Sequence, residues 1–401
     1  MRAAVLIALL AIPQLASART WYVLPDSTVD APTINAALDS SAEYDTILVG
    51  PGTYYGDVRF VNYPRRVLIS EAGPEMTILD ARDSETGFAD SRVILIAYSH
   101  RAVVEGFTIQ NGYAFSWPLP EGGGVYLKGS NYVILRGNII QDNESEGAGA
   151  IGFEYQCCKG TVIEENELVE NVSSEGAGCI SLYSGGAEEA YVIRGNTFSG
   201  NVGVWGVLHA EISNVIFEDN VVVGNTSTGL AGRQYCVMID RGHWVPQHID
   251  HNLVTQNQGS GIGFVGTYGG GSVVGNTVAD NTAYGITALH VTCAENVVVG
   301  NDTGFVSCDA DYSCNDSWGN VGSDYHPDCD PTGINGNISA NPCFCDRANG
   351  DYSIASESPC APANSGGCGL IGALDVGCTA TGVQEGSSEP STWGSIKQMF
   401  R

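Results

Sequence analysis

Asparagine recurs in pairs along this chain, and the two members of a pair always stand five positions apart. Eight such pairs follow one another: Asn138/Asn143, Asn166/Asn171, Asn196/Asn201, Asn220/Asn225, Asn252/Asn257, Asn276/Asn281, Asn296/Asn301 and Asn315/Asn320. The spacers between successive pairs differ in length. A fixed motif with variable spacers is expected where one structural unit stacks on itself and its surface loops differ.

Each repeat also contains three short apolar runs. One precedes the Asn pair, as in Tyr132–Leu135, and a second lies between or just beyond the two Asn, as in Ile139–Ile140. A third follows a Gly-rich turn, as in Gly124–Leu127. Runs of this length, rich in β-branched residues and bounded by turn residues, predict strands. Three strands per repeat with no helix between them predict one triangular coil of a β-helix.

The repeated Asn is interpreted as structural rather than catalytic. Stacked coils place equivalent residues about 4.8 Å apart. Asn tolerates the left-handed conformation of a coil corner. Its amide can also bond to the Asn above and below, as in a ladder. The glycosylation sequences that begin at Asn171, Asn225 and Asn301 are therefore expected to be ladder members first.

The two ends of the chain differ from the repeats. Residues 1–18 are predicted to be a signal peptide, because Arg2 precedes an apolar run too short for a membrane span and Ala16–Ala18 is a small-residue cleavage site. Residues 19–44 are predicted to form an N-terminal strand and a capping helix. Within that helix Ile34, Ala37 and Leu38 share one face. The β-helix and a disulfide-rich closing region occupy 45–378, and a linker with a short tail occupies 379–401.

Charge and cysteine content restrict the partners and the compartment. The net charge of −28 disfavours nucleic acid and anionic membranes, and also anionic polysaccharides unless a metal ion bridges them. No further segment is long and apolar enough to span a membrane. The 13 Cys together with the export signal predict disulfides in an oxidising compartment, and the odd count leaves one thiol unpaired or paired between chains. A zinc site is the alternative use of these Cys, but the spacing of Cys343 and Cys345 does not favour it.

Several segments resemble the bacterial secreted right-handed β-helix proteins of the pectate-lyase-like fold. They are Pro32–Leu38, Asp45–Tyr54 and Val104–Gly112 near the start, and Asn341–Asp346, Gly350–Ile354, Ser358–Cys360 and Gly369–Leu374, which resemble that family's closing coil. The resemblance covers about residues 20 to 378. It implies an all-β chain that forms a right-handed, single-stranded parallel β-helix, or solenoid, with a short N-terminal capping helix. It says little about activity, because one fold hosts many functions.

The resemblance suggests carbohydrate-active relatives, so acid–base groups are of interest. The chain has neither the paired Asp with Gly-His-Gly of polygalacturonases nor a clear cluster of Asp ligands. The densest local group is Asp240, Arg241 and His243, beside Trp244 in a long spacer. These three are the weak candidates for general acid–base work. The alternative interpretation is a solvated loop with a local ion pair.

Three Glu precede Gly-rich turns in consecutive repeats: Glu121, Glu146 and Glu175. If they stack, three carboxylates line up along the solenoid and repel one another unless solvent or a cation intervenes. Oxygen-rich carboxylate groups suit calcium. These residues are therefore the candidate metal ligands, and calcium is the only cofactor that the sequence suggests.

Alternation within the third strands predicts an outer face. Val125 and Leu127 should point inward, whereas Tyr126, Glu154 and Tyr183 should point outward. With Trp244 they are the candidate substrate-binding residues, and Trp117 and Trp205 are nearby aromatics. Aromatic packing against loops is the alternative. The register of His209 is ambiguous.

These patterns predict a secreted or cell-surface β-helix that binds, and possibly cleaves, an extracellular polysaccharide. A non-enzymatic structural or adhesive surface solenoid is the alternative. The sequence leaves open whether the chain is an enzyme.

Overall fold

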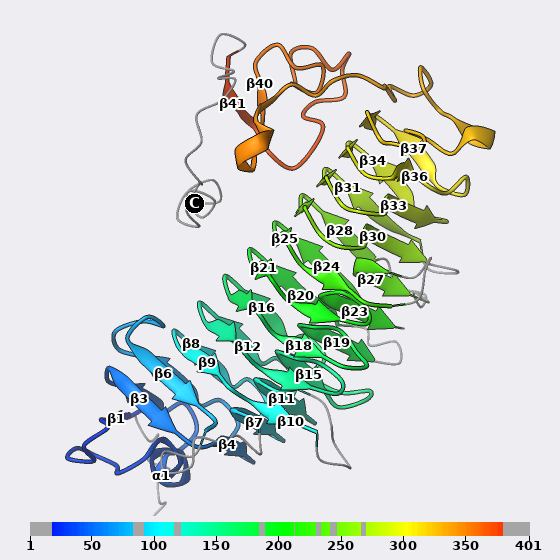
Figure 1. Cartoon of the computed structure of the whole chain (residues 1–401). Helices are drawn as coiled ribbons and strands as arrows, with labels where there is room; N and C mark the ends of the chain where they lie inside the picture. The colour runs from blue at the N-terminus through cyan, green and yellow to red at the C-terminus, as the bar shows by residue number, and fades with distance from the viewer. Residues whose placement is uncertain are drawn as a thin grey trace, which may run out of the picture.

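The apolar runs of successive repeats pair with one another, and the chain winds into a stack of coils (Figure 1). The computed structural model describes residues 18–82, 92–115, 122–183, 189–211, 213–229, 234–240, 247–265 and 270–379. Every pairing along the stack is parallel, and the described chain is a right-handed parallel β-helix, as predicted.

Three long parallel sheets form the walls of the solenoid. The twelve-stranded sheet contains β1 (Thr20–Val23), β2 (Thr46–Val49), β5 (Val67–Ser70), β8 (Val103–Glu105), β12 (Ile134–Arg136), β16 (Val162–Glu164), β20 (Tyr191–Arg194), β24 (Val215–Glu218), β28 (Gln247–Asp250), β31 (Gly271–Val274), β34 (Thr292–Ala294) and β37 (Asp311–Ser313). The eleven-stranded sheet contains β3 (Gly52–Tyr55), β6 (Thr77–Asp80), β9 (Thr108–Gln110), β13 (Ile139–Gln141), β17 (Glu167–Val169), β21 (Thr197–Ser199), β25 (Val221–Val223), β29 (Leu253–Thr255), β32 (Thr277–Ala279), β35 (Val297–Val299) and β38 (Asp316–Trp318).

The third wall is a ten-stranded sheet. It contains β4 (Val58–Val61), β7 (Ile94–Ala97), β11 (Val125–Lys128), β15 (Ile151–Phe153), β19 (Ile180–Tyr183), β23 (Leu208–Glu211), β27 (Tyr235–Asp240), β30 (Ser260–Val265), β33 (Tyr284–Leu289) and β36 (Thr303–Phe305). A short five-stranded sheet that the sequence did not predict follows the second Asn of each pair: β10 (Tyr113–Ala114), β14 (Glu144–Ser145), β18 (Val172–Ser173), β22 (Val202–Gly203) and β26 (Thr226–Ser227).

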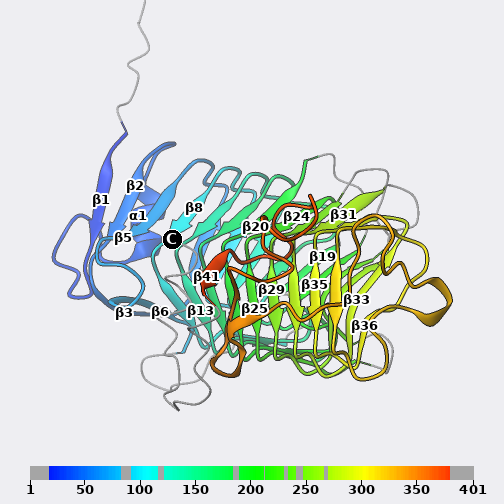
Figure 2. The ribbon, with the colours of Figure 1, turned by 90° about the horizontal axis from the view of Figure 1, so that it is seen from above.

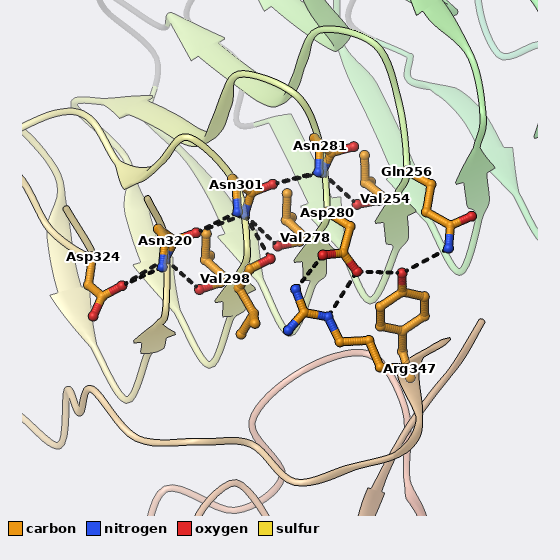
Figure 3. A network of polar contacts seen from close by, with 12 residues as sticks. Val254, Gln256, Val278, Asp280, Asn281, Val298, Asn301, Asn320, Asp324 and Arg347 are labelled. Carbon is orange, nitrogen blue, oxygen red and sulfur yellow. Dashed lines mark hydrogen bonds and ion pairs between the residues drawn. The ribbon is translucent and has the colours of Figure 1, made fainter. Parts of the chain in front are cut away.

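Two ladders of buried Asn connect the coils. The side-chain oxygen of Asn252, for example, accepts from the backbone N–H of Asn220 at 2.9 Å and from its Nδ2 at 3.0 Å. The Nδ2 of Asn252 donates in turn to the oxygen of Asn276 at 2.9 Å and to the carbonyl of Phe217 at 2.9 Å. The same pattern runs through the predicted pairs. The first ladder continues to Asn337, and the second ends on Asp324, which takes the place of an Asn (Figure 3).

The sequence predicts that the ladder Asn is the left-handed residue of each corner. In the structure the residue before the Asn is left-handed instead. Gly137, Asp142, Glu165 and Glu170 have φ values of 60°, 53°, 56° and 53°. This arrangement turns the chain just before the Asn and leaves the Asn itself in an ordinary conformation. Its amide can then point into the corner, where it meets the amides of the neighbouring coils.

A helix closes the N-terminal end, as predicted. Helix α1 (Ile34–Ser40) begins at Thr33, whose hydroxyl accepts from the backbone N–H of Ala36 at 3.1 Å. Ile34, Ala37 and Leu38 are buried and belong to the core of the coils. The helix therefore covers the apolar interior that the first coil would otherwise leave open.

The closing region does not stack as a last coil, which corrects our expectation. Strands β39 (Phe344–Asp346), β40 (Asp351–Ala355) and β41 (Val376–Cys378) form a separate sheet. With the short 3-10 helix η2 (Arg347–Asn349), they lie against the outer face of the eleven-stranded sheet, over β25, β29 and β35 (Figure 2). Ile354, Ile371 and Leu374 pack there against apolar side chains of the sheet.

A polar network fixes this region to the solenoid (Figure 3). The guanidinium of Arg347 binds both carboxylate oxygens of Asp280. The hydroxyl of Tyr352 donates to the same carboxylate at 2.8 Å and accepts from Gln256 at 3.3 Å. Asp280 lies three coils before the end of the stack. The closing region therefore folds back along the side of the helix because an apolar patch and a charged anchor are both present there.

Four disulfides are formed among the described residues: Cys157–Cys158, Cys308–Cys329, Cys314–Cys368 and Cys345–Cys378. Cys308–Cys329 ties the loop that contains the 3-10 helix η1 (Pro327–Cys329) to the last coils, and Cys314–Cys368 ties the closing region to them. Cys345–Cys378 joins β39 to β41 within the closing region. Cys179, Cys236, Cys293, Cys343 and Cys360 remain free, and the first three are buried in the core.

The predicted signal peptide lies outside the described residues except for its last position, and the predicted tail lies outside them from residue 380 onward. Among the residues that are described, no helix has the length and apolar character needed to cross a bilayer.

The ladder generates a test of what holds the coils together. Asn252→Ala removes the acceptor for two donors of Asn220 and the donor to the carbonyl of Phe217 and the oxygen of Asn276, at a site with no solvent exposure. We expect a loss of roughly 3 kcal/mol in the free energy of unfolding. Denaturant titration followed by circular dichroism measures it, with Val321→Ala, at a position that is 83% exposed, as the control. Equal midpoints for the two variants would contradict a structural ladder.

Candidate functional site

The outer face of the ten-stranded sheet carries two rows of side chains between β11 and β27. The charged row contains Lys128, Glu154, Tyr183, Glu211 and Asp240, and the central row contains Tyr126, Gly152, Ser181, His209 and Met238. These residues alternate with side chains that lie in the core of the coils. The outward direction of Tyr126, Glu154 and Tyr183 is therefore as predicted.

The charged row contains one ion pair and one pair of facing carboxylates. Lys128 and Glu154 form an ion pair at 3.4 Å, and their side chains are 28% and 32% exposed, so the pair adds little stability. Glu211 and Asp240 are register partners on β23 and β27. Two carboxylates directly opposite each other in paired strands repel. Asp240, the first predicted catalytic residue, belongs to this end of the row.

His209 lies at the centre of an aromatic cluster that the sequence did not reveal. Its ring stacks on Trp205, with centroids 4.9 Å apart and an interplanar angle of 18°. The hydroxyl of Tyr183 is 3.2 Å from Nδ1 of His209, and the Tyr183 ring meets the imidazole edge to face. His209 is 5% exposed, whereas Trp205 and Tyr183 are half-buried. The two aromatic rings therefore shield the imidazole from water.

Burial lowers the pKa of His209 to about 4, although the nearby carboxylate of Asp240 acts in the opposite direction. The imidazole is consequently neutral near pH 7. A neutral imidazole can accept a proton, and a tyrosine hydroxyl within hydrogen-bond distance can donate one. Tyr183 and His209 are thus a hydrogen-bonded pair of titratable groups on this face, although the low pKa makes the imidazole a weak base.

The position of Tyr126 corrects one prediction. Its direction is outward, but it is only 1% exposed, because the guanidinium of Arg92 lies 4.6 Å from the centre of its ring. Strand alternation predicts the face on which a side chain lies but not what covers it. Tyr126 is therefore not an open stacking surface.

The remaining predicted catalytic and aromatic residues of this loop, Arg241, His243 and Trp244, lie outside the described residues, as does Trp117. The structure brings Asp240 to the charged row, close enough to influence His209. Trp205 and His209 are four residues apart on either side of a tight Gly206 turn. The only sign of this contact in the sequence is the aromatic residue Trp205 four positions before His209.

The proposed carboxylate stack is only partly aligned. Glu146 and Glu175 are equivalent, since the backbone N–H of Glu175 donates to the carbonyl of Glu146 at 3.0 Å. Glu121 lies outside the described residues, but the strand that follows it pairs Val125 with Ile151. If Glu121 were aligned with Glu146, Val125 would pair with Ala150 instead. In the described residues that follow Glu121, the motif is therefore shifted by one residue relative to the next coil.

Other groups offer less chemistry. On the twelve-stranded sheet, Ser272 Oγ lies between His248 Nδ1, at 2.8 Å, and Asp250, at 3.0 Å. A nucleophilic serine requires the His between the other two groups, so this order does not activate it. Cys308, Cys329 and His326 lie close together, but the two thiols are joined as a disulfide. A cavity of about 410 Å³ at the N-terminal cap has one carboxylate, Asp57, among its lining residues, and that group binds Arg59.

Comparisons with known proteins agree with the architecture. Residues 82–222 match the family model described as the right-handed β-helix region. The crystal structure of the pectate lyase Pel9A aligns with a TM-score of 0.61 at 15% identity, over 91% of this chain and 98% of that one. No curated protein sequence gives a significant match.

Two other solved structures align less closely. A mannuronic-acid-specific family 6 polysaccharide lyase from human gut microbiota gives a TM-score of 0.45 at 12% identity, over 77% of this chain and 82% of that one. The A-module of the mannuronan C-5 epimerase AlgE6 of Azotobacter vinelandii gives 0.42 at 14% identity, over 77% and 94%. At these identities the comparisons show the fold. The chain has the right-handed β-helix fold of the pectate-lyase-like proteins.

The buried His209 should make stability depend on pH. Its pKa is about 4 when folded and about 6.5 when unfolded, so the unfolded chain binds the extra proton between these values. Its contribution is complete above pH 6.5 and is lost as the pH falls towards 4. Compared with His209→Gln, the wild type should lose about 3 kcal/mol more between pH 7 and pH 4.

Denaturation midpoints of both proteins at several pH values measure this difference. The comparison must be between variants, because burial raises the pKa of Asp316 to about 6 and thereby opposes the trend. His100→Gln, at an exposed position, is the control. Parallel pH profiles for wild type and His209→Gln would contradict the buried neutral imidazole.

Proposed function

We propose that this protein binds an extracellular polysaccharide across the outer face of the ten-stranded sheet, with Trp205, His209 and Tyr183 at the centre. The observation that carries the proposal is the buried imidazole held between two half-exposed aromatic rings. Aromatic rings with a few placed polar groups are the usual lining of ligand sites. The charged row beside the cluster supplies hydrogen-bond acceptors for sugar hydroxyls.

The shape of the central row supports an elongated ligand. Gly152 and Ser181 precede His209 in the row, so the side chains there are small. A chain that follows the stack of coils would cross one strand about every 4.8 Å. Pectate lyase Pel9A, whose fold is similar, acts on a polysaccharide, which supports this class of ligand.

If the bound chain is also cleaved, the acid–base pair is Tyr183 and His209. A lyase must remove a proton beside a carboxyl group and protonate the leaving oxygen, and a neutral imidazole with an adjacent hydroxyl can perform these two transfers. Asp240 would stabilise the imidazolium that forms. Calcium at Glu146 and Glu175 remains a proposal to be tested in the same assay. An adhesive solenoid without activity is the outcome if binding occurs without product.

Export to an oxidising compartment is part of the proposal. The Cys308–Cys329, Cys314–Cys368 and Cys345–Cys378 disulfides support it, because such bonds persist outside the cytosol.

A glycan array followed by a lyase assay tests the proposal. Trp205→Ala should weaken binding of the array ligand about tenfold, the effect of losing about 1.4 kcal/mol of aromatic contact. Tyr113→Ala, which removes a 44% exposed ring from the five-stranded sheet, is the matched control. No glycan binding by the wild type, or equal binding by both variants, would contradict the site.

Absorbance of unsaturated product, with and without calcium, tests cleavage. If the wild type forms product, Tyr183→Phe and His209→Gln should each reduce the rate by about a hundredfold, because each removes one proton-transfer group. Undiminished rates in both variants would exclude this pair as the catalytic groups.

A further inference from the structure

One corner of the β-helix presents the same backbone position from five consecutive coils. The corner lies where the chain enters the twelve-stranded sheet, two residues before β2, β5, β8, β12 and β16. The paired register of these strands places the corner residues above one another. They are Tyr44, Arg65, Arg101, Tyr132 and Gly160.

All five residues have left-handed backbones, with φ values of 72°, 58°, 59°, 59° and 66°. Such a conformation is strained for a bulky side chain and favours glycine. Gly160 shows that the corner accepts glycine. Glycine would suit the backbone of this position better. Four successive bulky residues there therefore indicate that their side chains have a role of their own.

Along the stack the four side chains follow the order Tyr, Arg, Arg, Tyr, so each Arg has a Tyr in the next coil. The guanidinium of Arg65 lies 5.4 Å from the centre of the Tyr44 ring, and that of Arg101 lies 4.8 Å from the centre of the Tyr132 ring. The Tyr132 ring extends over Gly160, where an added Cβ would be 2.5 Å from it. A neighbouring left-handed residue, Tyr98, adds a ring that is 51% exposed, and Tyr44 is 59% exposed.

Arg65 and Arg101 occupy adjacent coils, about 4.8 Å apart along the stack. Like charges in such neighbouring positions destabilise a sheet. Arg65 binds Glu43 at 3.1 Å. For Arg101, no ion pair is found within the part of the chain that the structure describes. In a chain with a net charge of −28, this is a local site where an added anion would relieve repulsion.

We propose that this Tyr/Arg corner, formed by Tyr44, Arg65, Tyr98, Arg101 and Tyr132, binds an anionic polysaccharide. Carboxylate or sulfate groups would pair with the two guanidinium groups, which suit planar oxyanions. The exposed rings would contact the apolar faces of the sugars. The net charge of −28 opposes any long polyanion, so the corner would bind a short stretch of the ligand, and single-stranded DNA is the competing polyanion in the test. The corner is separate from the outer face of the ten-stranded sheet, so this proposal does not depend on the function proposed for that face.

Binding to polygalacturonate, dextran sulfate and neutral dextran tests the corner and separates carboxylate from sulfate ligands. The wild type should bind one of the two polyanions at low salt and should not bind neutral dextran. Its affinity for the polyanion should fall at least tenfold when the salt is raised to about 0.5 M, because salt screens the charges. Arg101→Gly should weaken low-salt binding about tenfold. Arg194→Ala removes an equal charge from a side chain that is 52% exposed on another part of the solenoid and should bind as the wild type does.

Stability separates a binding role from a structural one. Arg101→Gly relieves a strained backbone, so its unfolding midpoint should equal or exceed that of the wild type. A lower midpoint would indicate that the side chain is there to hold the corner together, and would overturn the proposal. So would the absence of polyanion binding, equal losses in Arg101→Gly and Arg194→Ala, or a comparable affinity for single-stranded DNA.

Trp205→Ala distinguishes this proposal from the previous one. It should leave the salt-sensitive binding intact. A different result is that polyanion binding disappears in Trp205→Ala and persists in Arg101→Gly. That result would place the ligand on the outer face of the ten-stranded sheet and overturn the proposal for the corner. Loss of neutral-glycan binding in Trp205→Ala bears only on the sheet face.

Discussion

The buried amide ladder is the interaction on which the rest of the structure depends. Each ladder oxygen accepts both the backbone N–H and the Nδ2 of the Asn one coil before it, as Asn252 does for Asn220. A shift of one residue in any coil would leave several donors unpaired inside the protein, where unpaired polar groups are costly. Two ladders at two corners therefore fix the register of all three walls. The loops carry no such constraint and can vary in length.

The same corners also position side chains on the outside. At many ladder positions the left-handed residue before the Asn is glycine, but in one coil it is Asp280, whose side chain is the anchor for Arg347 of the closing region. At the opposite corner the left-handed position holds Arg101. A constraint imposed by internal packing thus places outer side chains at regular intervals. Side chains placed in this way can bind the chain's own C-terminal region or an external ligand.

This division explains how much could be predicted from the sequence. The ladder, the three strands of each coil and the N-terminal cap follow local patterns, and the structure confirms them. The position of the closing region depends on contacts with coils far away in sequence, such as Arg347 with Asp280, which no local pattern reveals. Tyr126 faces outward as predicted, but its cover comes from Arg92 in another coil. His209 was ambiguous because its environment is made by Trp205 and Tyr183 together.

The three outer walls are not equally suited to a ligand. The closing region covers part of the eleven-stranded sheet with its own apolar core. On the twelve-stranded sheet, charges neutralise one another across the coils, with Arg136 bound to Glu105 at 2.6 Å and Arg194 to Glu164 at 2.7 Å. The ten-stranded sheet has Glu211 and Asp240 on paired strands and a buried imidazole at His209. The closing region, within the residues that the structure describes, packs on a different wall, so it does not compete with a ligand for this face. The proposed polysaccharide site lies there for that reason.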